Sequence, residues 1–110
     1  MNLLPVTISA PGQLLLAGQR FLLEGPLEAL SAAFVGLPFT AGLRPEHLKL
    51  APATNRNLAA EVCHLEALGN EQLLTCRLCE GGQLLLVRAE ADAAVTLGQT
   101  VHLDVDPSGW

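Results

Sequence analysis

The chain has 110 residues with a formal net charge of −5, and half of its residues are hydrophobic. This length is typical of one domain, so residues 1–110 are expected to form a single unit with its own core. Six Lys and Arg residues, scattered singly, and 4% aromatic content argue against nucleic-acid binding, which needs a basic stripe and stacking rings.

Membrane insertion is also disfavoured by the sequence. No apolar run approaches the roughly 18 residues of a membrane span. The N-terminus lacks a basic region, and Pro5 interrupts its apolar stretch, so no signal peptide is expected. The three cysteines are an odd number without secretory context, which predicts reduced thiols in a cytoplasmic protein.

Short apolar stretches separated by glycine, proline and asparagine recur along the chain and are typical of an all-β protein. They predict nine strands, at residues 3–9, 14–16, 21–23, 39–44, 48–50, 59–68, 71–79, 83–89 and 100–105. Gly18 is expected to turn the second strand into the third as a hairpin. Residues 51–57 carry proline and asparagine and predict a surface loop between strands of one barrel.

Residues 27–34 are the best candidate for a helix. Leu27, Leu30 and Phe34 fall at helical spacing, and Pro26 stands near the start, where proline is tolerated. Gly36 and Pro38 follow as terminators. An irregular loop is the alternative interpretation of the same segment.

The stretch 59–68 contains an irregularity that bears on the fold class. Val62 is apolar, but the next residues that fit a core face are Leu65 and Leu68, which breaks strict alternation. A β-bulge between Val62 and Leu65 would restore the phase. Small barrels need such a bend in their long first strand. We therefore predict an all-β, OB-like small barrel with one or two short helices.

Cys76 and Cys79 are separated by two residues before a glycine pair, and Cys63-His64 lies upstream, which together resemble a zinc site. If 71–79 is a strand, however, Cys76 and Cys79 point to opposite faces. Buried cysteine is also a common small core residue. We expect no metal site.

No catalytic residues are predicted. A phosphate-binding loop needs a glycine-rich turn that ends in Gly-Lys-Ser or Gly-Lys-Thr, and the only lysine, Lys49, lies between two leucines. The histidines accompany no nucleophile motif, and the carboxylates are dispersed. The chain is therefore expected to be neither an ATPase nor another enzyme, and to bind no cofactor.

Two polar segments are candidate interaction sites. In Arg44-Pro45-Glu46 the proline favours an extended Arg44, so both charges can project to one side. They either form a local ion pair or contact a neighbouring protein. Gly69-Asn70 is a turn dipeptide because both residues tolerate positive φ, and Glu71 is then placed to cap the turn or pair across it.

Three segments carry a family resemblance: residues 1–5 at the start of the chain, residues 42–48 (Gly-Leu-Arg-Pro-Glu-His-Leu) and residues 65–71 (Leu-Glu-Ala-Leu-Gly-Asn-Glu). Together they resemble the C-terminal, transport-associated OB (TOBE) domain of ATPase subunits from bacterial ABC importers of the maltose and glycerol-phosphate type. The resemblance covers nearly the whole chain. It implies that the ATP-hydrolysing domain precedes residue 1, and that members usually continue past Trp110 with a few apolar residues, which bears on how the last strand is sealed.

The resemblance implies a regulatory and dimerisation domain, non-catalytic itself, on the cytoplasmic side of the inner membrane. ATP and Mg would belong to the parent protein. Implied partners are a second copy of the chain, its own ATPase domain and, indirectly, the membrane subunits, with Arg44, Glu46, Asn70 and Glu71 as interaction residues. The alternative is a sensor of an oxyanion such as molybdate, and a nucleic-acid-binding OB domain ranks third. Because few charges cover so many aliphatic residues, weak self-association through an apolar patch is expected.

Overall fold

A computed structural model describes all residues, 1–110, and contains all nine predicted strands. The strands are β1 (Asn2–Ala10), β2 (Gln13–Leu16), β3 (Gln19–Leu22), β4 (Pro38–Leu43), β5 (Leu48–Ala51), β6 (Leu58–Ala67), β7 (Glu71–Leu78), β8 (Leu84–Glu90) and β9 (Thr100–Val105). The predicted helix is also present, as α1 (Pro26–Ser31) continued by the 3-10 turn η1 (Ala32–Phe34). Two further 3-10 turns are η2 (Pro45–His47) and η3 (Pro107–Gly109).

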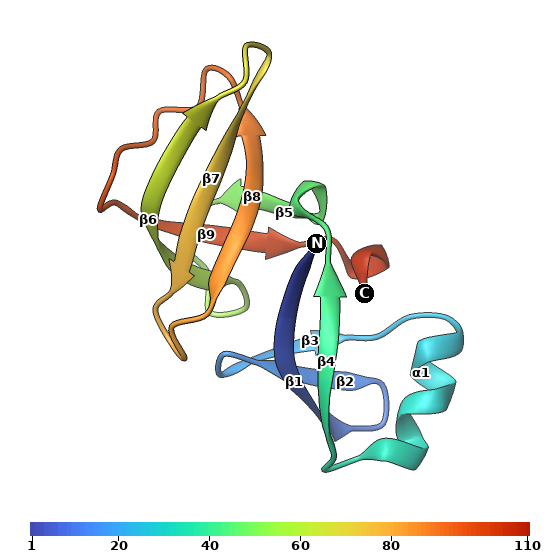
Figure 1. Cartoon of the computed structure of the whole chain (residues 1–110). Helices are drawn as coiled ribbons and strands as arrows, with labels where there is room; N and C mark the ends of the chain where they lie inside the picture. The colour runs from blue at the N-terminus through green and yellow to red at the C-terminus, as the bar shows by residue number, and fades with distance from the viewer.

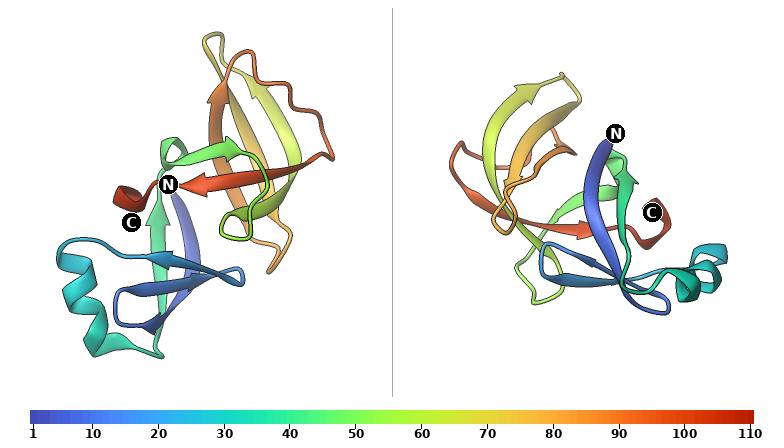
Figure 2. Two further views of the ribbon diagram at one scale, coloured as in Figure 1. Left: turned by 180° about the vertical axis from the view of Figure 1, so that it is seen from behind. Right: turned by 60° about the horizontal axis from the view of Figure 1, so that its bottom comes forward.

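The strands form two antiparallel sheets, which occupy the two ends of an elongated molecule (Figure 1). The first has the order β3-β2-β1-β4, and the second has the order β5-β9-β6-β7-β8. The second sheet curls into a nearly closed five-stranded barrel, with β5 beside β8. This confirms the predicted all-β, OB-like class. The barrel comprises only the five C-terminal strands, and α1 lies against the first sheet, far from the barrel (Figure 2).

One hydrophobic cluster of 18 buried residues extends through both sheets. It follows strand alternation: in β1, Leu4, Val6 and Ile8 are buried, while the residues between them face outward. The cluster is aliphatic, and its fully buried members include Leu43, Leu48, Leu58, Leu74, Leu85 and Leu103.

The predicted irregularities are confirmed. The β2–β3 hairpin turns at Ala17-Gly18, both with positive φ (49° and 77°), as a two-residue hairpin loop favours. In β6 the pairing with β7 shifts between Val62 and His64, which makes Cys63 the bulged residue. Residues 52–57 form the predicted loop, in which the Asn57 side chain donates to the Pro52 carbonyl at 2.8 Å.

A buried side chain connects the two sheets. The Asn2 amide donates to the Leu86 carbonyl at 2.8 Å and accepts from the Leu86 N–H at 2.7 Å. Asn2 thus satisfies both edge-facing backbone groups of Leu86 in β8, as a neighbouring strand would. This bond joins the start of β1 to the edge of the barrel. No helix in the structure has the length and apolarity that a transmembrane helix requires.

Candidate functional site

A polar groove of about 620 Å³ lies on the barrel, where η2, β5, β8 and the β6–β7 turn meet. Its lining residues are Glu46, Leu48, Lys49, Leu50, Asn70, Glu71, Arg88, Ala89, Glu90 and Ala93. Three of the four predicted interaction residues are therefore brought together. Arg44, the fourth, is exposed outside the groove.

Glu46 is positioned by η2. Arg44 is extended (φ −77°, ψ 149°), as predicted for a residue before proline, and its carbonyl accepts from the N–H of His47 at 3.0 Å. The His47 carbonyl in turn accepts from the N–H of Asp106 at 2.9 Å, which ties the turn to the end of β9. The resulting tight turn holds Glu46 at the groove.

Asn70 and Glu71 are positioned by the turn between β6 and β7. The N–H of Leu68 donates to the Glu71 carbonyl at 2.8 Å, which closes the two-residue turn Gly69-Asn70. Both residues tolerate positive φ, and the turn uses this tolerance at Gly69, whose φ is 86°, but not at Asn70. A single glycine in the left-handed region suffices to reverse the chain here.

Arg88 in β8 links the two polar segments, and sequence reasoning missed it. Its Nη1 lies 3.9 Å from Glu46 Oε2, and its Nε lies 3.8 Å from Glu71 Oε1. Glu46 therefore pairs with Arg88, and no ion pair forms between Glu46 and Arg44. Glu71 pairs with the next strand, β8, rather than across its own turn. Only the β7–β8 register, which places Arg88 opposite Leu73, could have revealed this arginine.

The groove has mixed charge with an acidic excess. Glu46, Glu71 and Glu90 contribute three carboxylates, and Lys49 and Arg88 contribute two cations. The pKa of Glu46 is lowered, chiefly because its own backbone N–H donates to the carboxylate, and further by the charges of Arg88, Arg44 and His47. Both ion pairs are longer than hydrogen bonds and involve half-exposed side chains, so Arg88 is free to exchange partners.

The cysteines occupy different environments. Cys76 is fully buried in β7, whereas Cys79 is exposed just beyond the end of the strand, and Cys63 is exposed at the bulge. Burial raises the pKa of the Cys76 thiol to about 11, with a smaller contribution from Cys63. The sequence predicts a strand that includes Cys79, but β7 ends at Leu78, so the two thiols are separated because Cys76 is in the core and Cys79 lies exposed beyond the strand. No group of three or more His, Cys, Asp or Glu residues is placed to hold a metal ion.

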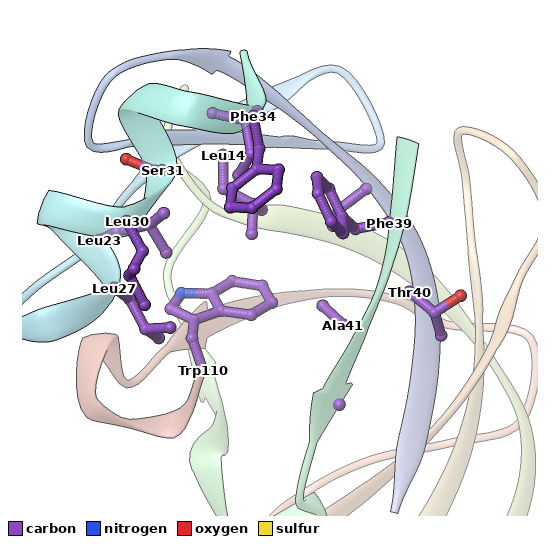
Figure 3. Close-up of a pocket in the computed structure, with 13 residues that line it drawn as sticks. Leu14, Leu23, Leu27, Leu30, Ser31, Phe34, Phe39, Thr40, Ala41 and Trp110 are labelled. Carbon is purple, nitrogen blue, oxygen red and sulfur yellow. The ribbon is translucent and has the colours of Figure 1, made fainter. Parts of the chain in front are cut away.

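A second concavity, on the other sheet, is apolar. A hollow of about 390 Å³ lies between α1 and the inner face of the first sheet, and Figure 3 shows the Trp110 indole projecting into it. The rings of Phe34 and Phe39 pack edge to face across it, with centroids 5.5 Å apart, and Trp110 packs on Phe21 at 5.6 Å. The indole Nε1 is buried without a hydrogen-bond partner. This hollow offers shape and apolar surface rather than reactive groups.

The structure is thus a small all-β domain with a five-stranded barrel, a polar groove on the barrel and an apolar hollow on the other sheet. Residues 41–110 match the family described as the TOBE domain, which covers more than half of the chain. The chain belongs to the TOBE domain family, which confirms the resemblance seen in residues 42–48 and 65–71.

Several bacterial relatives are similar along nearly the whole chain. The "sn-glycerol-3-phosphate import ATP-binding protein UgpC" of Yersinia pestis is 30% identical over 108 residues, covering 98% of this chain and 29% of the relative. The protein with the same name in Salmonella typhi is 35% identical over 107 residues, covering 94% of this chain and 28% of the relative. The counterpart in Pectobacterium atrosepticum is similar over a shorter part, with 31% identity over 75 residues, covering 68% of this chain and 20% of the relative. The chain thus spans less than a third of the length of these relatives.

Proposed function

We propose that this chain is the regulatory and dimerisation domain of the ATPase subunit of a bacterial ABC importer for sn-glycerol-3-phosphate or a related polyol or sugar. The observation that carries the proposal is similarity over 94–98% of the chain to import ATP-binding proteins that are more than three times as long. The residues that bind ATP and Mg would lie in the rest of such a protein. This chain contributes no phosphate-binding loop.

In this role the chain acts by contact rather than by chemistry. The polar groove, with Glu46, Asn70 and Glu71, is the surface proposed to meet the chain's own ATPase domain or the second ATPase subunit, and Arg44 lies at its margin. The weak Arg88 ion pairs suit such a role, because an incoming carboxylate or guanidinium can replace one of them at little cost. The membrane subunits would be reached indirectly, from the cytoplasmic side.

An oxyanion sensor is the alternative, and the electrostatics of the groove disfavour it. Three carboxylates line the groove against two cations, so an added anion would meet net repulsion there. The hollow on the other sheet is lined mainly by hydrophobic side chains, which do not compensate the desolvation of a doubly charged anion.

A chimera tests the proposal. The matching 107 residues of the Salmonella typhi relative are replaced by this chain, and subunit dimerisation, ATP hydrolysis and sn-glycerol-3-phosphate uptake are compared with the intact relative and with a deletion of that segment. The chimera should restore dimerisation and uptake, while the 110-residue chain alone hydrolyses no ATP. A folded chimera that behaves like the deletion would contradict the proposed function.

A further inference from the structure

The two sheets have four edge strands, β3, β4, β5 and β8, and all but β4 are either covered by other parts of the chain or carry a charge that opposes pairing. β5 and β8 lie beside each other and nearly close the barrel, and the Asn2 amide occupies the backbone groups of Leu86 on β8. β3 carries a charge at its centre, Arg20, and faces Asn55 and Arg56 of the loop across a shallow groove. Charged residues and covering loops are the usual means of protecting a sheet edge.

β4 is the exception. Its residues, Pro38 to Leu43, include no charged side chain, and the one feature that opposes pairing is Pro38 at its first position. β4 pairs only with β1, and no hydrogen bond outside the β1 ladder involves residues 38–43. The outward backbone groups of β4 therefore have no partner in the chain.

The register identifies these unpaired groups. The Ile8 carbonyl accepts from the Gly36 N–H at 2.8 Å, so the even-numbered residues of β1 direct their backbone groups toward β4. The β4 residues opposite these even-numbered residues, such as Ala41 opposite Leu4, therefore direct their backbone hydrogen bonds to β1. The alternate residues, Thr40 and Gly42, direct both N–H and C=O to the open side.

Apolar side chains surround this open edge. Six of the large hydrophobic residues that are at least 40% exposed lie in α1, η1, the link from η1 to β4 and the start of β4: Leu27, Leu30, Phe34, Val35, Leu37 and Phe39. Leu27, Leu30, Phe34 and Phe39 line the hollow, and β4 forms one of its sides (Figure 3). An unpaired strand edge offers backbone hydrogen bonds to another strand, and a contiguous apolar surface beside it offers area to bury, so the two together favour protein association.

We propose that the β4 edge pairs with the same edge of a second copy of this chain, antiparallel about a two-fold axis at Ala41. Thr40 of each copy then faces Gly42 of the other, and these two pairs exchange four backbone hydrogen bonds. An edge that pairs antiparallel with itself is self-complementary, and no like charges meet because β4 has none. The apolar residues around the hollow extend the contact on both sides.

This inference rests on the dimerisation stated in the proposed function and identifies the β4 edge as the surface through which two copies associate. The first test is sedimentation across a concentration series for the 110-residue chain and two variants, Thr40→Lys and Gln19→Lys. The Thr40 side chain is exposed and points away from the hollow (Figure 3), so lysine there charges the edge without filling the core. The Kd of the dimer should rise at least about tenfold for Thr40→Lys and change less than about twofold for the matched β3-edge variant. Unchanged circular dichroism establishes that both variants are folded.

Cross-linking provides the second test and fixes the axis. In a Cys63→Ser, Cys79→Ser background, which removes both exposed thiols, Ala41→Cys should form an intermolecular disulfide under mild oxidation, and Gln19→Cys should not. Residues opposite each other in a non-hydrogen-bonded pair have Cα atoms about 4.5 Å apart, within disulfide range.

The outcomes separate the two proposals. A dimer that is insensitive to Thr40→Lys and gives no Ala41→Cys cross-link would overturn the β4 edge and leave dimerisation standing. A chain that stays monomeric at high concentration and forms no cross-link would overturn both the β4 edge and the self-association on which it rests.

Discussion

The cores of the two sheets consist of the same aliphatic residue types, yet one sheet forms a nearly closed barrel and the other stays open. In the barrel, β9 pairs with both β5 and β6, and β5 lies beside β8, so the inward residues have neighbours on every side. Leu58, Leu74, Leu85 and Leu103 are accordingly at most 1% exposed. The first sheet ends at β4, and beside it Phe34 and Phe39 remain 42% and 40% exposed.

This contrast is confined to the edge of the open sheet, because the first sheet also buries Leu4, Leu16 and Leu43 to at most 1% exposure. A leucine in the core is therefore buried in either sheet, whereas a phenylalanine beside the open edge of β4 keeps about two fifths of its surface in water. The contrast also separates the roles of the two regions. The barrel carries the polar groove, while the open sheet keeps an unpaired edge and exposed apolar side chains, which is where we propose that a second copy pairs.

Truncations in the two regions should give the largest difference. Leu74→Ala removes a fully buried side chain from the barrel and should lower the free energy of unfolding by about 3 kcal/mol, because it leaves a cavity. Phe39→Ala should cost about 1 kcal/mol, because the ring is only partly buried and loses one aromatic contact. Urea denaturation of both variants measures the two costs. Equal costs would mean that the open sheet is as tightly packed as the barrel; if Leu74→Ala is too unstable to study, Val87→Ala offers a smaller truncation at the same core.

The link between the sheets should have the next largest effect. Asn2→Ala leaves the N–H and C=O of Leu86 without partners and should destabilise the chain by about 2 kcal/mol. Asn2→Asp keeps the acceptor for the Leu86 N–H and removes the donor. Amide exchange at Leu86 should accelerate strongly in Asn2→Ala and less in Asn2→Asp. If Leu86 exchanges equally slowly in all three proteins, the Asn2 link does not hold β1 to the barrel.

Local features of the fold could be predicted from the sequence because they depend on neighbours in the chain. Alternation placed the strands, and the broken phase between Val62 and Leu65 predicted the bulge now seen at Cys63. Gly18 marked its hairpin turn and Pro26 the start of the helix correctly, because left-handed or fixed backbone angles are properties of single residues.

The features that the sequence could not predict all depend on long-range pairing. The division into two sheets, and the position of β9 between β5 and β6 in the second, depend on pairings that no local pattern encodes. Of the candidate site, the sequence found Glu46, Asn70 and Glu71 but not the arginine that joins them, because Arg88 meets Glu46 only after η2 docks beside β8. Asn2 resembled an ordinary terminal residue, and its role depends on a bond across 84 residues of sequence.

The smallest expected effect is the pH dependence that Glu46 contributes, which tests how firmly the barrel fixes its groove. The pKa of Glu46 is lowered in the folded chain, so this group stabilises the fold above about pH 4.3, where it titrates in an unfolded chain, and the contribution is lost as the pH falls through the folded-state pKa. The difference in unfolding free energy between the wild-type chain and Glu46→Gln should therefore be constant near neutral pH and disappear in acid. Arg88→Gln should weaken this pH dependence without abolishing it, because the backbone N–H of Glu46 is the larger cause and Arg88 the lesser. Urea denaturation between about pH 2.5 and 7 measures both variants. If Arg88→Gln abolishes the pH dependence entirely, the ion pair, rather than the turn, positions the carboxylate, and the groove is less rigid than the closed barrel implies.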